Sequence, residues 1–281
     1  MAVAIVLAAL VLVSVLFSVL SPWWFTPLAS NWGMIDKTLF ITFIITGIVF
    51  AAVSLFMAYA VFRFRHRDGA KAAYEPESKR LEIWLTGVTS VGIAAMLAPG
   101  LIVWDDYVTV PSEASVVEVV GQQWNWTFRL PGADGVLGTV DARRIGSDNP
   151  FGLNPDDPKG QDDVLVNANE LRLPVGHPVK VVLRSIDVLH DFFVPQIRAK
   201  MDLVPGMVTY FWFTPEKVGT YEILCAELCG AGHSAMRGTV TVVEEAEYQP
   251  WLRGLPTFAQ SQAGNGPGRR RDLAQDAGAP R

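Results

Sequence analysis

The sequence predicts transmembrane helices at the N-terminus, followed by an all-β sandwich or barrel. Three long runs without a charged residue lie within the first 104 positions. Beyond them the chain changes to short, often alternating apolar runs separated by Gly, Pro, Asn and Asp, which is typical of all-β domains. Half of the 281 residues are hydrophobic and the mean hydropathy is +0.27. These values favour a chain with membrane spans over a wholly soluble one.

The composition excludes several other classes of protein. Charged residues make up only 18% of the chain, which argues against an intrinsically disordered protein. The net charge of −5 argues against a general nucleic-acid-binding protein, which needs a basic surface. Two cysteines in this length cannot make a disulfide-dense secreted scaffold.

The first segment, residues 1–20, is a single apolar run from position 2 onward. It is long enough to span a bilayer, and it stands where a secretory signal peptide would stand. It lacks the basic residues with which a signal peptide begins. We therefore favour a retained extra span, with a cleaved signal as the alternative.

Residues 21–104 are expected to form a transmembrane helical hairpin. The uncharged runs 38–62 and 83–104 each exceed the roughly 20 residues that cross a bilayer core. The loop 63–82 between them is rich in basic residues, namely Arg63, Arg65, Arg67, Lys71, Lys79 and Arg80. The positive-inside rule puts this loop in the cytoplasm. We thus expect a multi-pass protein in the lipid of the inner (cytoplasmic) membrane, with everything after Trp104 on the periplasmic, outer face.

Residues 105–250 are expected to form the outer β domain. This segment holds 21 Asp and Glu residues against 11 Lys and Arg, a net charge of −10. The acidity either keeps an exported domain soluble or steers a basic protein partner. Within it, residues 131–163 read as a long surface excursion, because they are polar and rich in turn-forming residues. Loops of this length are functional or mobile.

The last segment, residues 251–281, is rich in Gly, Pro, Ala and Gln. This composition predicts a disordered tail.

Both cysteines lie in one short stretch, Cys225-Ala-Glu-Leu-Cys229-Gly-Ala-Gly-His233-Ser-Ala-Met236. Thiolate, imidazole and thioether ligands together select copper, and zinc rarely uses a thioether. Two bridging sulfurs can hold two copper ions, each with a terminal histidine, with Met236 as a weak ligand of one ion and a backbone carbonyl on the other. A structural disulfide between the two cysteines is the alternative without a metal. It would close almost no chain and would leave His233 and Met236 unexplained.

At these residues the chain resembles subunit II of the haem–copper respiratory oxidases, the subunit that carries the binuclear CuA centre. The resemblance covers roughly residues 21–250. It is carried by the hairpin and by four motifs: GQQWNWTF (121–128), DVLHDFFVP (187–195), KMDLVPG (200–206) and CAELCGAGHSAM (225–236). It implies a cupredoxin-like Greek-key β domain. Gln122 departs from the family pattern, which commonly has His there.

The resemblance implies a role for each site residue. Cys225 and Cys229 would bridge two copper ions, with His190 and His233 as terminal ligands. Met236 and the backbone carbonyl of Glu227 would complete the two coordination spheres.

Further roles are implied outside the copper ligands. The Glu227 side chain would reach a magnesium ion at the interface with subunit I. Trp124 would receive the electron from a docked donor; a plain core aromatic is the alternative. Glu82 would mark the cytoplasmic mouth of a proton pathway, against a membrane-edge carboxylate without a role.

The function implied is that of the electron-accepting subunit of a terminal oxidase. It would take electrons from a cytochrome c and pass them to haem in subunit I, where oxygen is reduced to water with proton translocation; subunit III is a further expected partner. A CuA subunit of a haem–copper nitric oxide reductase is the main alternative. A quinol oxidase subunit II would lack these ligands, and a copper chaperone would have a more open site.

Overall fold

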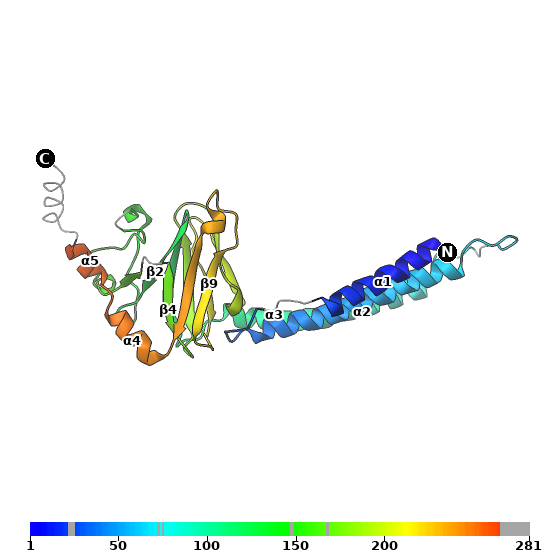
Figure 1. Ribbon diagram of the computed structural model, residues 1–281, viewed down its shortest axis with the longest axis horizontal. Helices are drawn as coiled ribbons and strands as arrows, with labels where there is room; N and C mark the ends of the chain where they lie inside the picture. Colours follow the sequence, from blue (N-terminus) through cyan, green and yellow to red (C-terminus); the bar gives the residue numbers. More distant parts are fainter. Residues whose placement is uncertain (22–25, 72–73, 75, 147–148, 167–168, 265–281) are drawn as a thin grey trace. The chain divides into compact units, whose positions relative to one another are not determined.

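The computed structural model describes residues 1–21, 26–71, 74, 76–146, 149–166 and 169–264. The described chain divides into two compact units. Residues 1–26 and 33–105 form a helical unit, and residues 27–32 together with the chain from 106 onward form a β unit. Figure 1 shows the helices and strands of each unit.

The helical unit contains three helices that are long and apolar enough to cross a membrane: α1 (Ala2–Leu20), α2 (Gly33–Arg63) and α3 (Lys79–Val108). Their apolar side chains are largely exposed, as expected for helices in lipid, where each helix satisfies its own backbone hydrogen bonds. Helix α1 lies along α2 and buries Ala4 and Val11. Small side chains at such contacts let helices approach closely. The predicted apolar helices are confirmed, and α2 and α3 extend beyond the apolar runs at both ends. That the first is a retained span stays a prediction.

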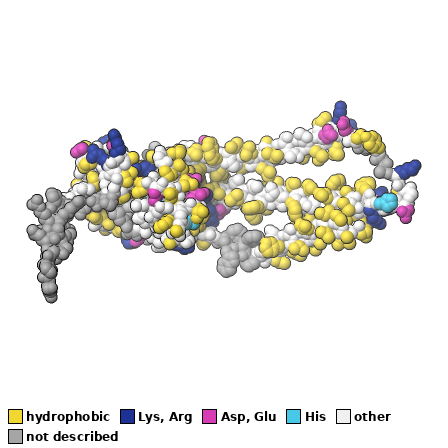
Figure 2. All heavy atoms as spheres, turned by 90° about the horizontal axis from the view of Figure 1, so that it is seen from above, with side chains coloured by type: hydrophobic (Ala, Val, Ile, Leu, Met, Phe, Trp, Pro, Cys, Tyr) yellow, Lys and Arg dark blue, Asp and Glu magenta, His cyan; other side chains and the backbone are white. Residues whose placement is uncertain are grey.

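Basic side chains gather at the loop between α2 and α3, beyond the apolar parts of both helices (Figure 2). Near this end, the Arg65 guanidinium lies over the Phe62 ring, 4.7 Å from its centroid. The basic residues on which the predicted orientation rests thus lie together at one end of the helical unit.

The β unit is built from two five-stranded sheets. The first has the order β3-β2-β1-β5-β8, with strands β3 (Val164–Val166), β2 (Asn125–Leu130), β1 (Ser115–Gln122), β5 (Val179–Ser185) and β8 (Thr209–Phe213). The second has the order β4-β10-β9-β6-β7, with strands β4 (Glu170–Pro174), β10 (Arg237–Val243), β9 (Gly219–Cys225), β6 (His190–Val194) and β7 (Ala199–Leu203).

Alternation of side chains along the strands explains how the two sheets share one core. In β5, every second residue of Val179–Ser185 is buried, as the period of a strand requires. The large buried side chains include Trp126, Phe192 and Phe211. Strands β1 and β5 pair in parallel, as do β10 and β4; the other pairings are antiparallel. The predicted fold class, N-terminal helices followed by a cupredoxin-like β-sandwich, is confirmed.

Residues 27–32 belong to the β unit, although we expected all of 21–104 to form the hairpin. The Ser30 hydroxyl donates a hydrogen bond of 2.6 Å to the carbonyl of Ile197. The Trp32 indole donates to the carbonyl of Trp212 at 2.9 Å, and the two rings meet edge to face. Hydrogen bonds between residues so distant in sequence could not be read from the local pattern.

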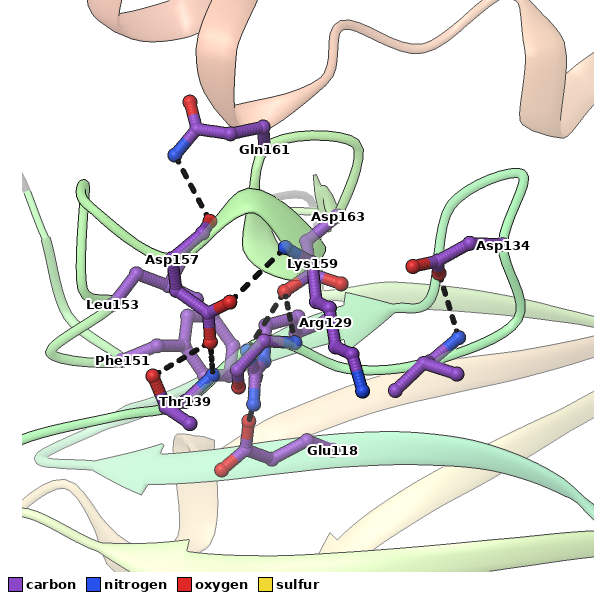
Figure 3. A network of polar contacts seen from close by, with 12 residues as sticks. Glu118, Arg129, Asp134, Thr139, Phe151, Leu153, Asp157, Lys159, Gln161 and Asp163 are labelled. Atoms are coloured by element: carbon purple, nitrogen blue, oxygen red, sulfur yellow. Dashed lines mark hydrogen bonds and ion pairs between the residues drawn. The ribbon is translucent and has the colours of Figure 1, made fainter.

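Buried charged side chains of the first sheet contact the excursion 131–163 (Figure 3). Arg129 of β2 contacts Glu118 of β1 and lies 2.8 Å from Asp163, and all three side chains are buried. Arg184 of β5 also pairs with Glu118, so two arginines balance two carboxylates. Such pairing is what permits charged groups in an interior. Burial raises the pKa of Asp163 to about 6, although Arg129 opposes the shift.

Apolar packing also orders the excursion. Phe151 and Leu153, both from the excursion, are fully buried and form a small cluster with Val120 and Phe258. Two short helical turns, Ala142–Arg144 and Pro158–Gly160, lie within the same segment. The excursion therefore packs against the β unit and has a defined structure in its described part.

The expectation of a disordered tail from residue 251 is wrong for the part that the structure describes. Helix α4 (Glu245–Arg253) is followed by α5 (Phe258–Gly264). The Phe258 amide donates to the carbonyl of Asp163 at 2.7 Å, and its side chain is only 2% exposed. The Ala259 amide also donates to the carbonyl of Gln161 at 3.0 Å, so one large apolar side chain and two backbone hydrogen bonds hold this segment against the excursion. Residues 265–281 lie outside the described part of the chain.

Candidate metal centre

The residues predicted to bind metal come from two neighbouring strands and the loop that follows one of them. His190 begins β6 and Cys225 ends β9. These strands pair with Phe192 opposite Cys225, which puts His190 close to the end of β9. Cys229 lies in the loop between β9 and β10, and His233 opens a short helical turn, His233–Ala235, that leads into β10.

Every predicted ligand group faces one of the two sulfurs. The Cys225 and Cys229 Sγ atoms are 3.7 Å apart. The Nδ1 atom of His190 lies 3.9 Å from Cys225 Sγ, and that of His233 lies 3.6 Å from Cys229 Sγ. The Met236 Sδ atom is 3.8 Å from Cys229 Sγ, and the Glu227 carbonyl oxygen is 3.2 Å from Cys225 Sγ.

The arrangement fits a metal ion in both chemistry and burial. One ligand atom from each of His190, Cys225 and Cys229 lies within 4.8 Å of the other two, and all three residues are buried. Met236 is also buried, and His233 is half-buried. Both cysteines are free thiols. The 3.7 Å between their Sγ atoms is far longer than an S–S bond of about 2.05 Å. Soft sulfur and imidazole donors around such a small space suit copper.

The surroundings of Cys229 make its thiol less acidic than that of a free cysteine. Burial, together with hydrogen bonding to Cys225, raises the pKa of the Cys229 thiol to about 11. The thiolate is the form that binds metal. A metal ion bound there would therefore displace a proton from this sulfur.

Asp187 orients His190, a role that sequence reasoning missed. The Oδ1 atom of Asp187 lies 2.9 Å from His190 Nε2, which leaves Nδ1 to face the sulfurs. Burial alone would raise the pKa of Asp187, but hydrogen bonds from Gln123 and His190 hold it below its usual value. Carboxylates that hold the second nitrogen of a ligating histidine recur in metal sites. Its position three residues before His190 was the only local signal.

Trp124 lies beside the cluster in the turn between β1 and β2. Its indole nitrogen donates to the carbonyl of Cys229 at 3.2 Å, and the side chain is 41% exposed. The ring packs on Gly232, where a Cβ atom would overlap it. Trp124 is therefore both open to solvent and hydrogen-bonded to the loop that carries Cys229, which does not fit a plain core aromatic.

Glu82 lies elsewhere, in the first turn of α3 within the helical unit, and its side chain is exposed. The Glu227 side chain is half-buried. The roles predicted for these two carboxylates stay predictions.

Comparison with known proteins adds a family to this geometry. Residues 115–243 match the family model described as "Cytochrome C oxidase subunit II, periplasmic domain". A protein of Bradyrhizobium diazoefficiens described as "Alternative cytochrome c oxidase subunit 2" is 62% identical over 259 residues, which cover 92% of this chain and 94% of that protein. The "Cytochrome c oxidase subunit 2" of Cereibacter sphaeroides is 31% identical over 238 residues, covering 81% and 77% of the two chains.

Among solved structures, a match is the crystal structure of the periplasmic domain of subunit II of cytochrome oxidase (CoxB) of Bradyrhizobium japonicum. It is 26% identical and covers 52% of this chain and 96% of that chain, with a TM-score of 0.39.

Proposed function

The chain belongs to the cytochrome c oxidase subunit 2 family, a family of oxidoreductase subunits, and from this premise we propose that it is the electron-accepting subunit of a membrane-bound terminal oxidase. It would take electrons from a cytochrome c and deliver them to haem in subunit I, where oxygen is reduced to water with proton translocation. The observation that carries the proposal is the convergence of two free cysteines, two histidines and a methionine around one small space.

The family implies copper, and the donor set of this chain supports a binuclear CuA centre. Cys225 and Cys229 would bridge two ions, and His190 and His233 would each bind one. Met236 and the backbone carbonyl of Glu227 would be the weak ligands that complete the two coordination spheres. Copper bound there supplies a site that takes up and releases one electron.

The chain's own residues would hold this site rigid and dry. His190, Cys229 and Met236 are at most 3% exposed. Asp187 fixes the His190 ring through a hydrogen bond of 2.9 Å. His190 and Cys225 also stand on strands β6 and β9. Ligands held in this way move little when the charge of the site changes, and a small rearrangement favours fast electron transfer.

Trp124 would be the point of contact with the donor. It combines an exposed ring face with a hydrogen bond to the Cys229 carbonyl. That bond gives an electron arriving at the ring a short route into the peptide that carries a bridging sulfur.

Assembly and location follow from the same premise. The basic loop 63–82 would face the cytoplasm, which puts the β unit on the outer side of the inner membrane. Subunit I would be the main membrane partner, and subunit III a second one. The Glu227 side chain would reach a magnesium ion at the subunit I interface, and Glu82 would stand at a proton-pathway mouth.

Electron uptake is tested by Trp124→Phe in the purified oxidase complex. We expect the rate of cytochrome c oxidation to fall strongly while the copper absorption spectrum stays unchanged. Trp251→Phe is the matched control, because Trp251 lies on α4, which follows the end of β10 remote from the copper loop. Unchanged cytochrome c oxidation in Trp124→Phe with copper intact would exclude this route. Nitric oxide reduction without oxygen uptake by the complex would favour the nitric oxide reductase instead.

A further inference from the structure

We infer that Gln123 is a positioning residue of the metal centre, because it joins the two loops that carry the predicted ligands. The inference rests on the proposed function, since it assumes that the centre binds copper. Gln123 stands in the turn between β1 and β2, one residue before Trp124. It would act through Cys229 and His190 rather than by touching a metal ion.

The side chain of Gln123 holds the loop of Cys229. Its Nε2 atom donates a hydrogen bond of 2.8 Å to the Cys229 carbonyl, across 106 positions of sequence. The following residue, Gly230, has a φ of +114°, and a Cβ atom there would lie 2.9 Å from the Gln123 amide nitrogen. A glycine at this position therefore permits both the backbone conformation and the close approach of the amide.

The backbone of Gln123 holds the other loop. Its amide nitrogen donates to Asp187 Oδ2 at 2.7 Å. The second oxygen of the same carboxylate lies 2.9 Å from His190 Nε2. A hydrogen bond from a backbone N–H to a carboxylate is charge-assisted and stronger than one between neutral groups.

One residue thus fixes the distance between a histidine ligand and a bridging cysteine that come from different parts of the fold. The Cys229 carbonyl accepts two donors, from Gln123 at 2.8 Å and from Trp124 at 3.2 Å, which fills the capacity of a carbonyl oxygen. Both N–H dipoles point their positive ends at the peptide of a bridging thiolate. That field favours the reduced, more electron-rich centre and should raise its reduction potential.

The side chain donor is tested by Gln123→Glu, which keeps the shape and replaces the donor with a negatively charged acceptor. Gln122→Glu is the matched control, because Gln122 is the preceding residue, is exposed, and would undergo the same change of charge. Both variants are made in the full chain, loaded with copper in detergent, and compared by electron paramagnetic resonance and redox titration. We expect Gln122→Glu to keep the hyperfine pattern of the unmodified chain, and Gln123→Glu to have an altered pattern and a lower reduction potential.

A second variant covers the case in which Gln123→Glu does not fold, as judged by far-ultraviolet circular dichroism. Gln123→Met is of similar length, uncharged and without a donor, and retains the backbone bond to Asp187. We expect it to change the hyperfine pattern as well. Spectra and potentials of the Gln123 variants indistinguishable from those of Gln122→Glu and of the unmodified chain would overturn the positioning role. A copper-loaded unmodified chain without a binuclear pattern would instead overturn the proposed function.

Discussion

Phe258→Ala should destabilise the β unit by about 3–5 kcal/mol, the usual cost of removing a buried phenylalanine ring. Phe258 is 2% exposed and belongs to one cluster with Val120, Phe151 and Leu153. Its ring is the large apolar contact that ties α5 to the excursion. A cavity there would loosen both segments together, because Phe258 is the residue of α5 in this cluster and packs against Phe151 and Leu153 of the excursion.

The magnitude translates into a shift of the thermal midpoint. For a unit of 150–250 residues, 1 kcal/mol corresponds to about 2–4 °C. Phe258→Ala should thus lower the midpoint of the β unit by roughly 6–20 °C. The copper spectrum at low temperature should not change, because the ligands belong to other strands and loops.

The assay is thermal unfolding of the full chain in detergent, followed by near-ultraviolet circular dichroism. Gln262→Ala is the matched control, because Gln262 is exposed on the same helix. The control should unfold like the unmodified chain. If Phe258→Ala also unfolded at that temperature, the C-terminal helix would not be part of the cooperative β unit, and our explanation of the ordered excursion would be wrong.

Two further variants probe Asp187, beside His190, and the buried Asp163. Asp187→Ala should weaken copper binding about 10–100-fold, because His190 loses the acceptor that orients it; competition with a copper chelator measures this, and an unchanged affinity would argue against that role. Asp163 has a pKa of about 6, raised by burial from 3.8, so the folded chain retains a proton there between these values while the unfolded chain releases it. Its contribution therefore weakens the fold as the pH rises from about 4 to about 6, by up to about 3 kcal/mol, of which roughly half falls between pH 5 and pH 7. Asp163→Asn should remove that part of the pH dependence in urea unfolding at pH 5 and pH 7, and an unchanged difference would contradict the assignment.

The short stretch 225–236 could be interpreted from sequence because its donors are close together in the chain. Two cysteines, a histidine and a methionine within one loop must lie near one another in any fold. The role of His190 could be predicted only through the resemblance, since 35 positions separate it from Cys225. Asp187 and Gln123 act through hydrogen bonds across strands, and no local pattern indicates such partners.

The excursion and the C-terminal segment show where composition misleads. Residues 131–163 are polar on average, but the two apolar residues Phe151 and Leu153 are fully buried. Asp163 is buried as well, although aspartate is almost never fully buried unless it is paired. Its pairing with Arg129 depends on the sheet, which a local reading does not contain. Phe258 orders a segment whose composition is otherwise that of a flexible tail.

The most direct test of the copper assignment is the electron paramagnetic resonance spectrum of the full chain loaded with copper, together with its metal content. We predict two copper ions per chain and a seven-line hyperfine pattern, because one unpaired electron shared equally by two copper nuclei of spin 3/2 gives seven lines. Cys229→Ser should abolish that pattern, since it removes one of the two bridging sulfurs. One copper ion per chain with a four-line pattern, or a spectrum unaffected by Cys229→Ser, would contradict a binuclear centre at these residues.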